Sequence, residues 1–417
     1  MNRVCPTCAR TYPDAVFFCG EDGVITVQEQ DPERFDARLG KQLGGYIVVA
    51  HVADGAMGRV YEGRHPETKS RVAIKVLHDH VARDAVSVER FKREYETARE
   101  MSHPNVVKVL EYGETSDHSY FLTMEYLQGQ ELRKVLASKQ RLPKERIVRI
   151  ASQVAVALDH AHSFGFIHRD LKPDNIFLCE TPDGADVRVL DFGSVKLQME
   201  TGAKLTAIGT TLGSPYYMSP EQAMGAADVD QRSDVFALGA ILYEMITNKV
   251  AFEAPNVAMI LMKIMNETPT PPSSLNPESP HSLDDVVEKA IRKDKKARYA
   301  AASAMADAML AAYGLNGTAA EWAHKPEAEI ASALAAATPA APKPFGHSLA
   351  PAVPDKPPEK KVHRPDVAAE QPSPSARPSI ESSVGLPPTR ASSGNAKVIV
   401  GVAIGIAVLG LLALLMR

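Results

Sequence analysis

Apolar positions in the middle of the chain follow two periods, one after the other. At first apolar and polar side chains alternate, and this period of two predicts β-strands. These strands are expected over residues 46–51, 59–64 and 71–77. From Glu89 to Met101 the apolar residues lie three and four positions apart, which predicts an α-helix. The pattern therefore changes from sheet to helix early in this part of the chain.

Longer helical patterns follow up to residue 314. They are expected over residues 144–162, 232–247 and 283–293. A strand-rich beginning and a helix-rich remainder predict an α+β fold, with residues 43–314 forming one globular region of two lobes. A cleft between two such lobes is a common place for a ligand.

Composition changes after this globular region. Residues 315–396 hold 14 of the 30 prolines, many alanines and serines, and few large apolar side chains. Such a segment buries too little apolar surface to offset the entropy of ordering its backbone. We therefore expect a disordered linker over residues 315–396.

An uncharged apolar run follows the proline-rich segment. Val398 to Met416 is 19 residues long and is bounded by Lys397 and Arg417. As a helix it would extend roughly 28 Å, which matches the hydrocarbon thickness of a bilayer. We therefore expect a transmembrane helix over residues 397–417, and a buried core helix is the alternative.

Charges and small residues near this run suggest an orientation and a contact. The basic residues before it are Lys360, Lys361, Arg364, Arg390 and Lys397. They favour a cytoplasmic location for the preceding chain, and the N-terminus carries no apolar secretory segment. We expect a single-pass membrane protein with its bulk in the cytoplasm.

Gly401 and Gly405 form a small-xxx-small pair that fits a homodimer, but glycine is common in membrane helices, and both readings stay open.

The first thirty residues hold three of the four cysteines. Cys5 and Cys8 have the spacing of a zinc knuckle, Cys19 follows, and Asp22 stands where a fourth cysteine would complete a zinc ribbon. Zinc accepts carboxylate oxygens, so a Cys₃Asp site is chemically reasonable. Residues 1–30 are predicted to form a zinc-ribbon-like unit with a structural Zn²⁺, followed by a linker over residues 31–42. A decayed ribbon that binds no metal is the alternative.

The densest group of chemically active side chains runs from His168 to Asn175. Asp170 can accept the proton of an attacking hydroxyl and orient that hydroxyl. Lys172 lies two residues further on and can reach a transferring phosphate. Together these side chains are suited to moving a phosphoryl group from a nucleotide to an alcohol.

A second part of the same equipment is Asp191-Phe192-Gly193. Two strands are expected between Asn175 and Asp191, joined by a Pro182-Asp183-Gly184 turn. Such a hairpin brings Asn175 and Asp191 together at one end. Their side-chain oxygens are suitable ligands for Mg²⁺ or Mn²⁺.

Upstream, a lysine lies on an apolar strand face. Lys75 shares its face with Ala73 and Leu77, so it needs an acidic partner. Glu94 lies on the apolar stripe of the following helix and is the natural candidate. A structural ion pair is one reading. The other is a lysine that holds nucleotide phosphates and is positioned by Glu94.

A glycine-containing loop precedes this lysine. It runs from Ala53 to Val60 between two predicted strands and contains Gly55 and Gly58, which let backbone N–H groups approach phosphates. Alone this pattern fits an ordinary hairpin turn. The ordered motifs that follow favour a phosphate-binding loop.

With these motifs in order, residues 46–313 resemble a eukaryotic-type protein kinase domain of the bacterial branch, and Lys172 resembles the serine/threonine class. The resemblance implies a bilobal kinase fold, ATP as phosphoryl donor, Mg²⁺ and protein substrates. It implies that Met124 is the gatekeeper and that Glu125, Tyr126 and Leu127 form the hinge that meets adenine. It also implies an ion pair of Glu221 with Arg298, and Asp234 bracing the catalytic loop. The implied nucleotide-site residues are Ala53, Gly55, Gly58, Val60, Ala73, Lys75, Glu94, Met124, Glu125, Leu127, Asn175 and Asp191.

One position departs from the family pattern. Ala53 stands where the family has the first glycine of the loop, and this change could lower the affinity for ATP.

The segment from Ser194 to Met218 offers several hydroxyls, and a buried Arg169 beside Asp170 seeks an anion. We expect autophosphorylation at Thr206, Thr210 or Thr211.

The net charge of the chain bears on one class of partner, nucleic acid. A net charge of -4 gives no support for nucleic acid as a partner. An active serine/threonine kinase at a membrane is the leading interpretation. The alternative is a catalytically impaired, membrane-anchored scaffold that works through its zinc-ribbon-like module.

Overall fold

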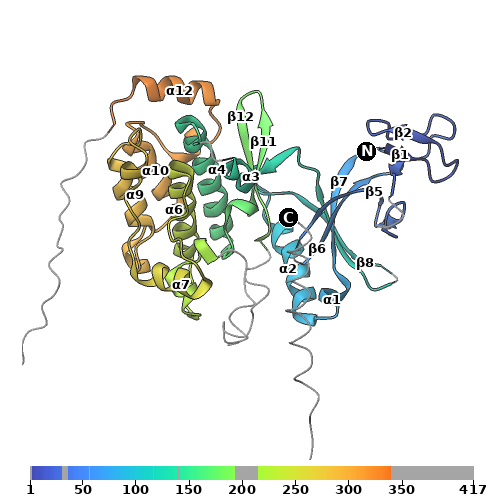
Figure 1. Ribbon diagram of the computed structural model, residues 1–417, viewed down its shortest axis with the longest axis horizontal. Coiled ribbons are helices and arrows are strands. Elements are labelled where there is room, and N and C mark those ends of the chain that lie inside the picture. The colour runs from blue at the N-terminus through green and yellow to red at the C-terminus, as the bar shows by residue number, and fades with distance from the viewer. Residues whose placement is uncertain are drawn as a thin grey trace, which may run out of the picture. The chain divides into compact units, whose positions relative to one another are not determined.

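The computed structural model describes residues 2–30, 36–55, 57–115, 117–138, 141–192 and 215–339. These residues form a small N-terminal unit, a strand-rich lobe and a helical lobe (Figure 1). The expected membrane helix over 397–417 and most of the expected linker lie outside this range. Within it, no helix combines the length and the apolar character needed to cross a bilayer.

The N-terminal unit is a three-stranded antiparallel sheet with the order β2-β1-β3. Its strands are β1 (Asn2–Val4), β2 (Thr11–Pro13) and β3 (Val27–Gln28). Its interior holds a charged side chain, because Arg3 is only 2% exposed. Arg3 donates hydrogen bonds to the hydroxyl and the carbonyl of Thr26, at 3.1 and 2.9 Å. The unit therefore depends on polar contacts as well as on apolar packing.

The strand-rich lobe is built on one antiparallel sheet with the order β4-β5-β6-β7-β9-β8. Its strands are β4 (Gln42–Leu43), β5 (Tyr46–Asp54), β6 (Gly58–Arg64), β7 (Arg71–Leu77), β8 (Val109–Glu114) and β9 (Tyr120–Glu125). The two faces of β7 enter different apolar clusters, with Ile74 in one and Leu77 in the other. The alternation that predicted this strand is confirmed, and it directs Lys75 to the same side as Leu77.

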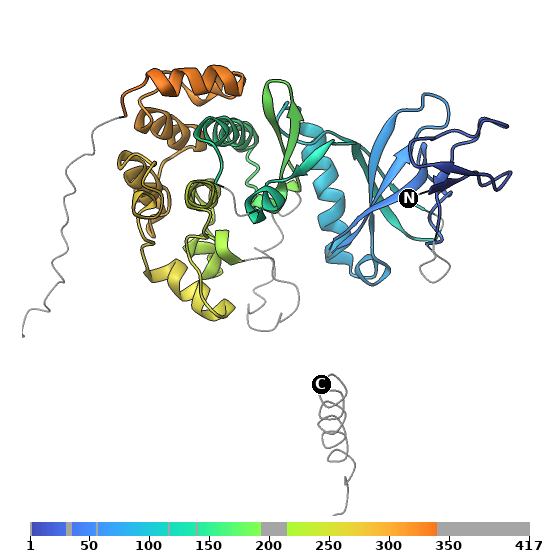
Figure 2. The same ribbon diagram turned by 45° about the horizontal axis from the view of Figure 1, so that its top comes forward.

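A long helix covers one face of this sheet. After the short α1 (Asp79–Ala82), α2 (Ala85–Glu100) begins at Asp84, whose carboxylate accepts hydrogen bonds from Val86 N and Ser87 N. It packs Phe91 against Leu77 and Leu122. The helix lies on the side of the sheet that faces the helical lobe (Figure 2). Its acidic residue Glu94 is therefore directed toward the region between the lobes.

The helical lobe surrounds α4 (Lys144–Ser163), of which Ile150, Val154 and Leu158 are fully buried. The longer helices around it are α6 (Arg232–Thr247), α7 (Val257–Asn266), α9 (Ser282–Ala290) and α10 (Ala302–Ala312). Shorter elements are β10 (Gly129–Glu131), α3 (Leu132–Ala137), the 3-10 helices η2 (Pro173–Asn175), η6 (Pro215–Tyr217) and η7 (Lys295–Ala297), β11 (Ile176–Thr181), β12 (Gly184–Val189), α5 (Pro220–Ala223) and α8 (Pro272–Leu275). The helices that the sequence predicted are confirmed.

The predicted start of the disordered linker at residue 315 is wrong. Two further helices, α11 (Ala319–Trp322) and α12 (Glu327–Ala336), continue the helical lobe and contact α4. Their large apolar side chains, Trp322, Ile330 and Leu334, are buried, with Ile330 fully enclosed. Polar contacts add to this packing, since Arg149 donates a hydrogen bond to the carbonyl of Lys325.

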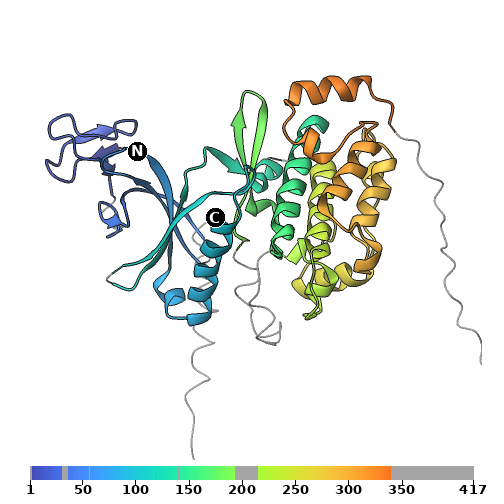
Figure 3. The same ribbon diagram turned by 180° about the vertical axis from the view of Figure 1, so that it is seen from behind.

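The same extension also contacts the β11–β12 hairpin (Figure 3). The backbone N–H of Glu327 donates to the carbonyl of Asp183 at 2.8 Å, and the Glu327 carboxylate accepts from Ala185 N at 2.9 Å. Gly184 has a positive φ of 110°, which other residues rarely adopt, and a Cβ there would also lie 2.5 Å from the Glu327 side chain, so this turn favours glycine. The extension is thereby held to the turn of this hairpin, at the end opposite to Asn175 and Asp191.

The extension should contribute measurably to stability. We expect Trp322→Ala to lower the free energy of unfolding by about 3 kcal/mol, because the side chain is 7% exposed and its indole N–H bonds to Asn316 O at 2.8 Å. Denaturant unfolding of the full chain measures the change. Glu329→Ala, at an exposed position of α12, is the control and should change stability by less than about 0.5 kcal/mol. Equal stability of Trp322→Ala and wild type would show that the extension is not part of the folded lobe.

Candidate active site

The side chain of Lys75 contacts acidic residues from both lobes. Its ammonium donates to Glu94 Oε1 and Oε2 at 3.1 and 3.2 Å, and to Asp191 Oδ1 at 2.8 Å. Glu94 comes from α2 and Asp191 follows β12 of the helical lobe, so three distant parts of the sequence converge. The contact with Glu94 that the sequence predicted is confirmed, and Asp191, expected in the same nucleotide site, is the second partner.

The charges of this triad are interdependent. Burial opposes the charge of Lys75, but the Asp191 and Glu94 carboxylates hold the pKa of Lys75 above its usual range. Burial also raises the pKa of Glu94 to about 8, with Lys75 opposing and Asp191 reinforcing the rise. Burial would raise the pKa of Asp191, but the charge of Lys75 together with hydrogen bonds to Glu94 and Lys75 lowers it. The protonation of each of these three groups therefore depends on the charges of the other two.

Strand register aligns the predicted nucleotide-site residues. Ala53 is opposite Val60, Val60 is opposite Lys75, and Ala73 is opposite Met124. These pairs form adjacent rows across the sheet on the face of Lys75. The pairing of β5 with β6 shifts in register between His51 and Ala53, and it resumes at Ala53, so alanine at the position of the usual glycine still pairs with Val60.

The hairpin between β5 and β6 requires glycine at one point. A Cβ at Gly58 would lie 2.1 Å from the carbonyl oxygen of Val76, which no other residue could tolerate. Gly55 N donates to Gly58 O at 2.9 Å and closes the loop, and Gly55 O contacts the ring of His78 at 3.0 Å. The loop that the sequence predicted is thus fixed at its base to the end of β7.

The segment after β9 corresponds to the predicted hinge. Glu125 ends β9, where its N–H donates to the carbonyl of Lys108 at 2.9 Å. Tyr126 and Leu127 follow in extended chain between the lobes and are half-buried. The ring of Tyr126 lies under the guanidinium of Arg71, with 3.5 Å from Cζ to the ring centroid.

The catalytic loop holds its polar groups close together. Lys172 Nζ donates to Asp170 Oδ2 at 2.8 Å, and Asn175 Nδ2 donates to the backbone carbonyl of Asp170 at 2.8 Å. The side-chain nitrogen of Asn175 is engaged in this hydrogen bond, so its side-chain oxygen is the atom left to bind a metal ion. The backbone N–H of Leu190 donates to the backbone carbonyl of Asn175 at 2.9 Å, so Asn175 and Asp191 lie close together as predicted. The residues fit a divalent cation with oxygen ligands.

A buried carboxylate supports this loop from below. Asp234 accepts hydrogen bonds from the backbone N–H groups of His168 and Arg169, at 2.8 and 2.9 Å. It comes from the first turn of α6 and is 1% exposed. Arg169 has a positive φ of 64°, which costs energy for a non-glycine residue and needs such support. The bracing role implied by the kinase resemblance is confirmed by these contacts.

Sequence reasoning missed a histidine that completes this support. His162 at the end of α4 contacts Asp234 Oδ2 at 2.8 Å and lies 3.7 Å from Asp159 Oδ1. Burial opposes protonation, but the two carboxylates raise the pKa of His162 to about 9. The sequence did contain a sign of this contact, because Asp159 and His162 are three positions apart and therefore lie on one side of the helix.

This histidine predicts a pH dependence of stability. Its folded pKa lies above the ordinary value near 6.5, so protonated His162 stabilises the fold below about pH 6.5, and this contribution is lost as pH rises through about 9. We expect the stability advantage of wild type over His162→Gln to shrink by roughly 3 kcal/mol between these limits. Denaturant unfolding at several pH values measures it. The control is His118→Gln, the same change at an exposed histidine. A constant difference for His162→Gln would contradict the assignment.

Arg169 has no hydrogen-bond partner for its Nε among the residues that the structure describes. Burial lowers the pKa of this guanidinium, with Asp234 opposing. The expected phosphorylation sites Thr206, Thr210 and Thr211 lie outside the described residues, as does Gly193.

Beyond the catalytic loop, the predicted ion pair in the helical lobe is present. Arg298 Nη1 and Nη2 donate to the two oxygens of Glu221, each at 2.7 Å. Gln222 lies beside Glu221 and was missed by the sequence reasoning. Its side chain donates to the carbonyl of Arg169 at 2.6 Å and so ties α5 to the catalytic loop.

The four expected zinc ligands also converge. The ligand atoms of Cys5, Cys8, Cys19 and Asp22 all lie within 4.8 Å of one another. Cys8 Sγ is 3.5 Å from Cys19 Sγ, and Cys5 Sγ is 3.4 Å from Asp22 Oδ2. Three thiols and one carboxylate at such distances suit a tetrahedral zinc ion.

Comparison with known proteins gives a consistent result. The family model described as "Protein kinase domain" matches residues 46–310. The serine/threonine-protein kinase pkn3 of Myxococcus xanthus is 39% identical over 275 residues, which cover 64% of this chain and 50% of pkn3. Pkn1 of the same organism is 36% identical over 306 residues, which cover 73% of this chain and 43% of Pkn1. The chain thus matches about half the length, or less, of these curated relatives.

Solved structures agree with the sequence relatives. A crystal structure of the PknI kinase domain from Mycobacterium tuberculosis aligns with a TM-score of 0.53 and 29% identity, covering 65% of this chain and 97% of the solved chain. A second crystal structure of the same kinase domain aligns with a TM-score of 0.51 and 30% identity, again covering 65% and 97% of the two chains. The match of the family model begins at residue 46, so it does not include the N-terminal cysteine unit.

Proposed function

The chain belongs to the protein kinase domain family, and on this premise we propose that it transfers the γ-phosphoryl group of ATP to serine or threonine hydroxyls of proteins. The observation that carries the proposal is the convergence of Lys75, Glu94 and Asp191, with Lys75 within 3.2 Å of both acids. A scaffold without activity would have no need to keep this set intact together with Asp170 and Asn175.

Each side chain has a separate task in this proposal. Lys75, positioned by Glu94, holds the nucleotide phosphates. Asp170 accepts the proton of the attacking hydroxyl, and Lys172, which donates to Asp170, offers positive charge to the transferring group. Asn175 and Asp191 would hold Mg²⁺ or Mn²⁺, which supplies charge neutralisation at the phosphates when bound.

Transfer of labelled phosphate from ATP to a basic protein substrate tests this activity. We expect phosphoserine and phosphothreonine in wild type, and no labelling by Lys75→Met at matched protein concentration. Phosphotyrosine as the main product would reject the assigned class. Equal labelling by Lys75→Met would show that the activity comes from a contaminating kinase.

We also propose that phosphorylation of the segment after Asp191 activates the enzyme. The half-buried Arg169 beside Asp170 carries an Nε with no partner among the described side chains, and a phosphate is a strong anionic partner for it. Thr206, Thr210 and Thr211 are the proposed sites. Mass spectrometry of protein incubated with ATP should find phosphate on at least one of them. A fully active preparation without phosphate on these residues would reject this part of the proposal.

The cysteine unit is proposed to bind one structural Zn²⁺ through Cys5, Cys8, Cys19 and Asp22. The mutual distances of these ligand atoms support it. Metal analysis of the full chain purified without chelator should give about one zinc per chain, and Cys8→Ser should lower it. The absence of zinc in wild type, with no zinc uptake on titration, would reject the site.

The remaining proposal concerns location. Residues 397–417 are proposed to anchor the protein in a membrane, with the kinase domain in the cytoplasm and residues 340–396 as a tether. Fractionation of cells that express the full chain, compared with a chain ending at residue 396, tests the anchor. Equal solubility of both would reject it. Crosslinking of the membrane fraction would reveal whether Gly401 and Gly405 support a homodimer.

A further inference from the structure

The N-terminal unit packs on the strands that carry the nucleotide site. Strand β3 lies against β5, and Gln28 Oε1 accepts a hydrogen bond from the backbone N–H of His51 at 3.1 Å (Figure 1). His51 stands two residues before Ala53 at the start of the glycine-containing loop. The unit therefore contacts the backbone of the strand from which this loop extends.

A second contact is made by an aromatic ring between two guanidinium groups. The ring of Phe17 lies 4.4 Å from Cζ of Arg3, within the same unit, and 3.7 Å from Cζ of Arg64 on β6. Such cation–π contacts are worth about 0.5–2 kcal/mol each, more when water is excluded. Phe17 thus joins the N-terminal unit to the strand-rich lobe.

From Arg64 a continuous series of contacts leads to the hinge. The buried carboxylate of Glu62 pairs with Arg64 at 3.1 Å and with Arg71 at 2.8 Å. Arg71 in turn covers the ring of Tyr126 in the hinge. Burial lowers the pKa of Arg3, and the carboxylate of Glu62 opposes this effect. One carboxylate therefore connects the cysteine unit with the segment expected to meet adenine.

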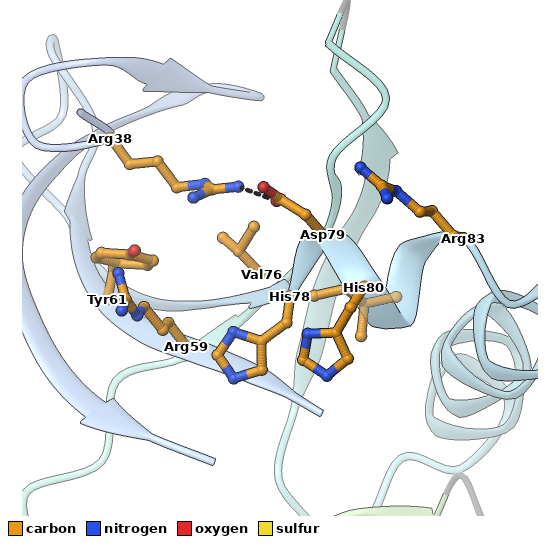
Figure 4. A pocket seen from close by; sticks show the side chains of 9 residues that line it. Arg38, Arg59, Tyr61, Val76, His78, Asp79, His80 and Arg83 are labelled. Atoms are coloured by element: carbon orange, nitrogen blue, oxygen red, sulfur yellow. Dashed lines mark hydrogen bonds and ion pairs between the residues drawn. The ribbon is translucent and has the colours of Figure 1, made fainter. Parts of the chain in front are cut away.

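The connection after the unit is fixed to the same strands. Asp36 accepts a hydrogen bond from Tyr61 Oη at 2.7 Å and pairs with Arg59 at 3.3 Å, and Arg59 also pairs with Asp54 at 2.8 Å. Arg38 pairs with Asp79 across a cavity of about 410 Å³ beside Arg59 and Tyr61 (Figure 4). The base of the glycine loop is therefore held from this side as well.

Two residues of the N-terminal unit that contribute to its packing on the strand-rich lobe, Arg3 and Phe17, lie close in sequence to the expected metal ligands. Arg3 stands two residues before Cys5, and Phe17 two residues before Cys19. A metal ion bound to these thiols would restrict the backbone conformation at Arg3 and Phe17. Without it, the short β1, β2 and β3 have little apolar core to hold them.

We infer that the cysteine unit is a clamp on the nucleotide site, so that metal binding in the unit and nucleotide binding in the cleft strengthen each other. The inference rests on the proposed function, because it needs both ligands. Each ligand favours the same docked arrangement, in which Phe17, Arg64, Glu62 and Arg71 are in contact. Coupling between two sites must be reciprocal, so the factor by which zinc improves nucleotide affinity must equal the factor by which nucleotide improves zinc affinity.

The test measures four affinities of the full chain. They are those of a non-hydrolysable ATP analogue with and without zinc, and of zinc with and without the analogue. We expect about a five- to tenfold improvement in each direction, with the two factors equal. Two ligands that both bind, with factors of one, would overturn the inference and leave the proposed function intact. Failure of zinc or of the analogue to bind at all would instead reject that part of the proposed function.

Two variants keep the inference testable in every case. Arg71→Met breaks the contact between Glu62 and the hinge, and it should bring the coupling factor close to one while zinc still binds. Phe17→Ala loosens docking directly and should weaken analogue binding about five- to tenfold even if zinc does not bind. Arg10→Ala is the matched control, because Arg10 pairs with Glu21 on the exposed surface of the same unit. Unchanged analogue affinity in Phe17→Ala would overturn the inference.

Discussion

Replacement of Asp170 by asparagine is expected to lower the rate of phosphoryl transfer by about 10²–10⁴-fold without loss of nucleotide affinity. The Asp170 carboxylate is the group that accepts the hydroxyl proton, and an amide of the same shape cannot do so. The loop itself should persist, because Asn175 bonds to the backbone carbonyl of Asp170 and Asp234 holds the backbone N–H groups of the two preceding residues. Steady-state kinetics with a protein substrate and equilibrium binding of an ATP analogue separate the two effects.

Asp174 provides the matched control for this prediction. It lies in the same loop, is partly exposed, and pairs with Arg133 at 3.4 Å instead of with Lys172. Asp174→Asn makes the same chemical change four residues away and should leave the rate of phosphoryl transfer close to that of wild type. If both variants lost activity equally, the loop's overall charge, and not a proton acceptor at Asp170, would be the requirement.

The strands and helices that frame this site were predictable because their apolar periods are regular. Arg71–Leu77 and Arg232–Thr247 have the bounds that the pattern gave them. The convergence of Lys75 with Glu94 followed from a simple requirement, since a lysine on an apolar face needs an acid within reach. The pairing with Asp191 followed from the kinase resemblance, because no local pattern relates residues so far apart.

The C-terminal extension was not predictable from composition. Alanine-rich sequence with few large apolar residues is typical of disordered segments, but α11 and α12 need only a few apolar contacts because α4 already offers a packed surface. The added polar contacts use backbone groups of the extension: the Arg149 side chain donates to the carbonyl of Lys325, and the N–H of Glu327 donates to the carbonyl of Asp183. Such contacts depend on where the partner surface lies, and sequence patterns carry little information about it.

The packing of the cysteine unit on the strand-rich lobe was missed for a related reason. Its contacts are a buried arginine, a ring between guanidinium groups and a side-chain amide on a strand N–H. Charged residues are normally read as exposed, so a pattern of polarity assigns Arg3 and Arg64 to the surface. The membrane helix, the tether and the phosphorylated threonines stay predictions.

Breaking the ion pair of Arg298 with Glu221 is expected to be among the most destabilising single changes in the helical lobe. The Arg298 side chain is fully buried and donates to both oxygens of Glu221. Arg298→Met would leave a buried carboxylate without its cation, which typically costs about 3–5 kcal/mol. Denaturant unfolding of the full chain measures the loss. Arg292→Met, at an exposed residue that pairs with Glu288 at 3.7 Å, is the control and should cost at most about 1 kcal/mol.

A double-mutant cycle identifies which contact is responsible. Arg298 also donates to the backbone carbonyls of Arg232, Arg292 and Lys293, at 3.0, 2.6 and 3.1 Å. If the carboxylate is the essential partner, Glu221→Gln combined with Arg298→Met should be less destabilising than the sum of the two single changes, because the unpaired charge is gone. Additive losses would mean that the three carbonyls hold Arg298 independently of Glu221. The guanidinium would then connect the start of α6 with the chain after α9 through these carbonyls, and its pairing with Glu221 would be incidental.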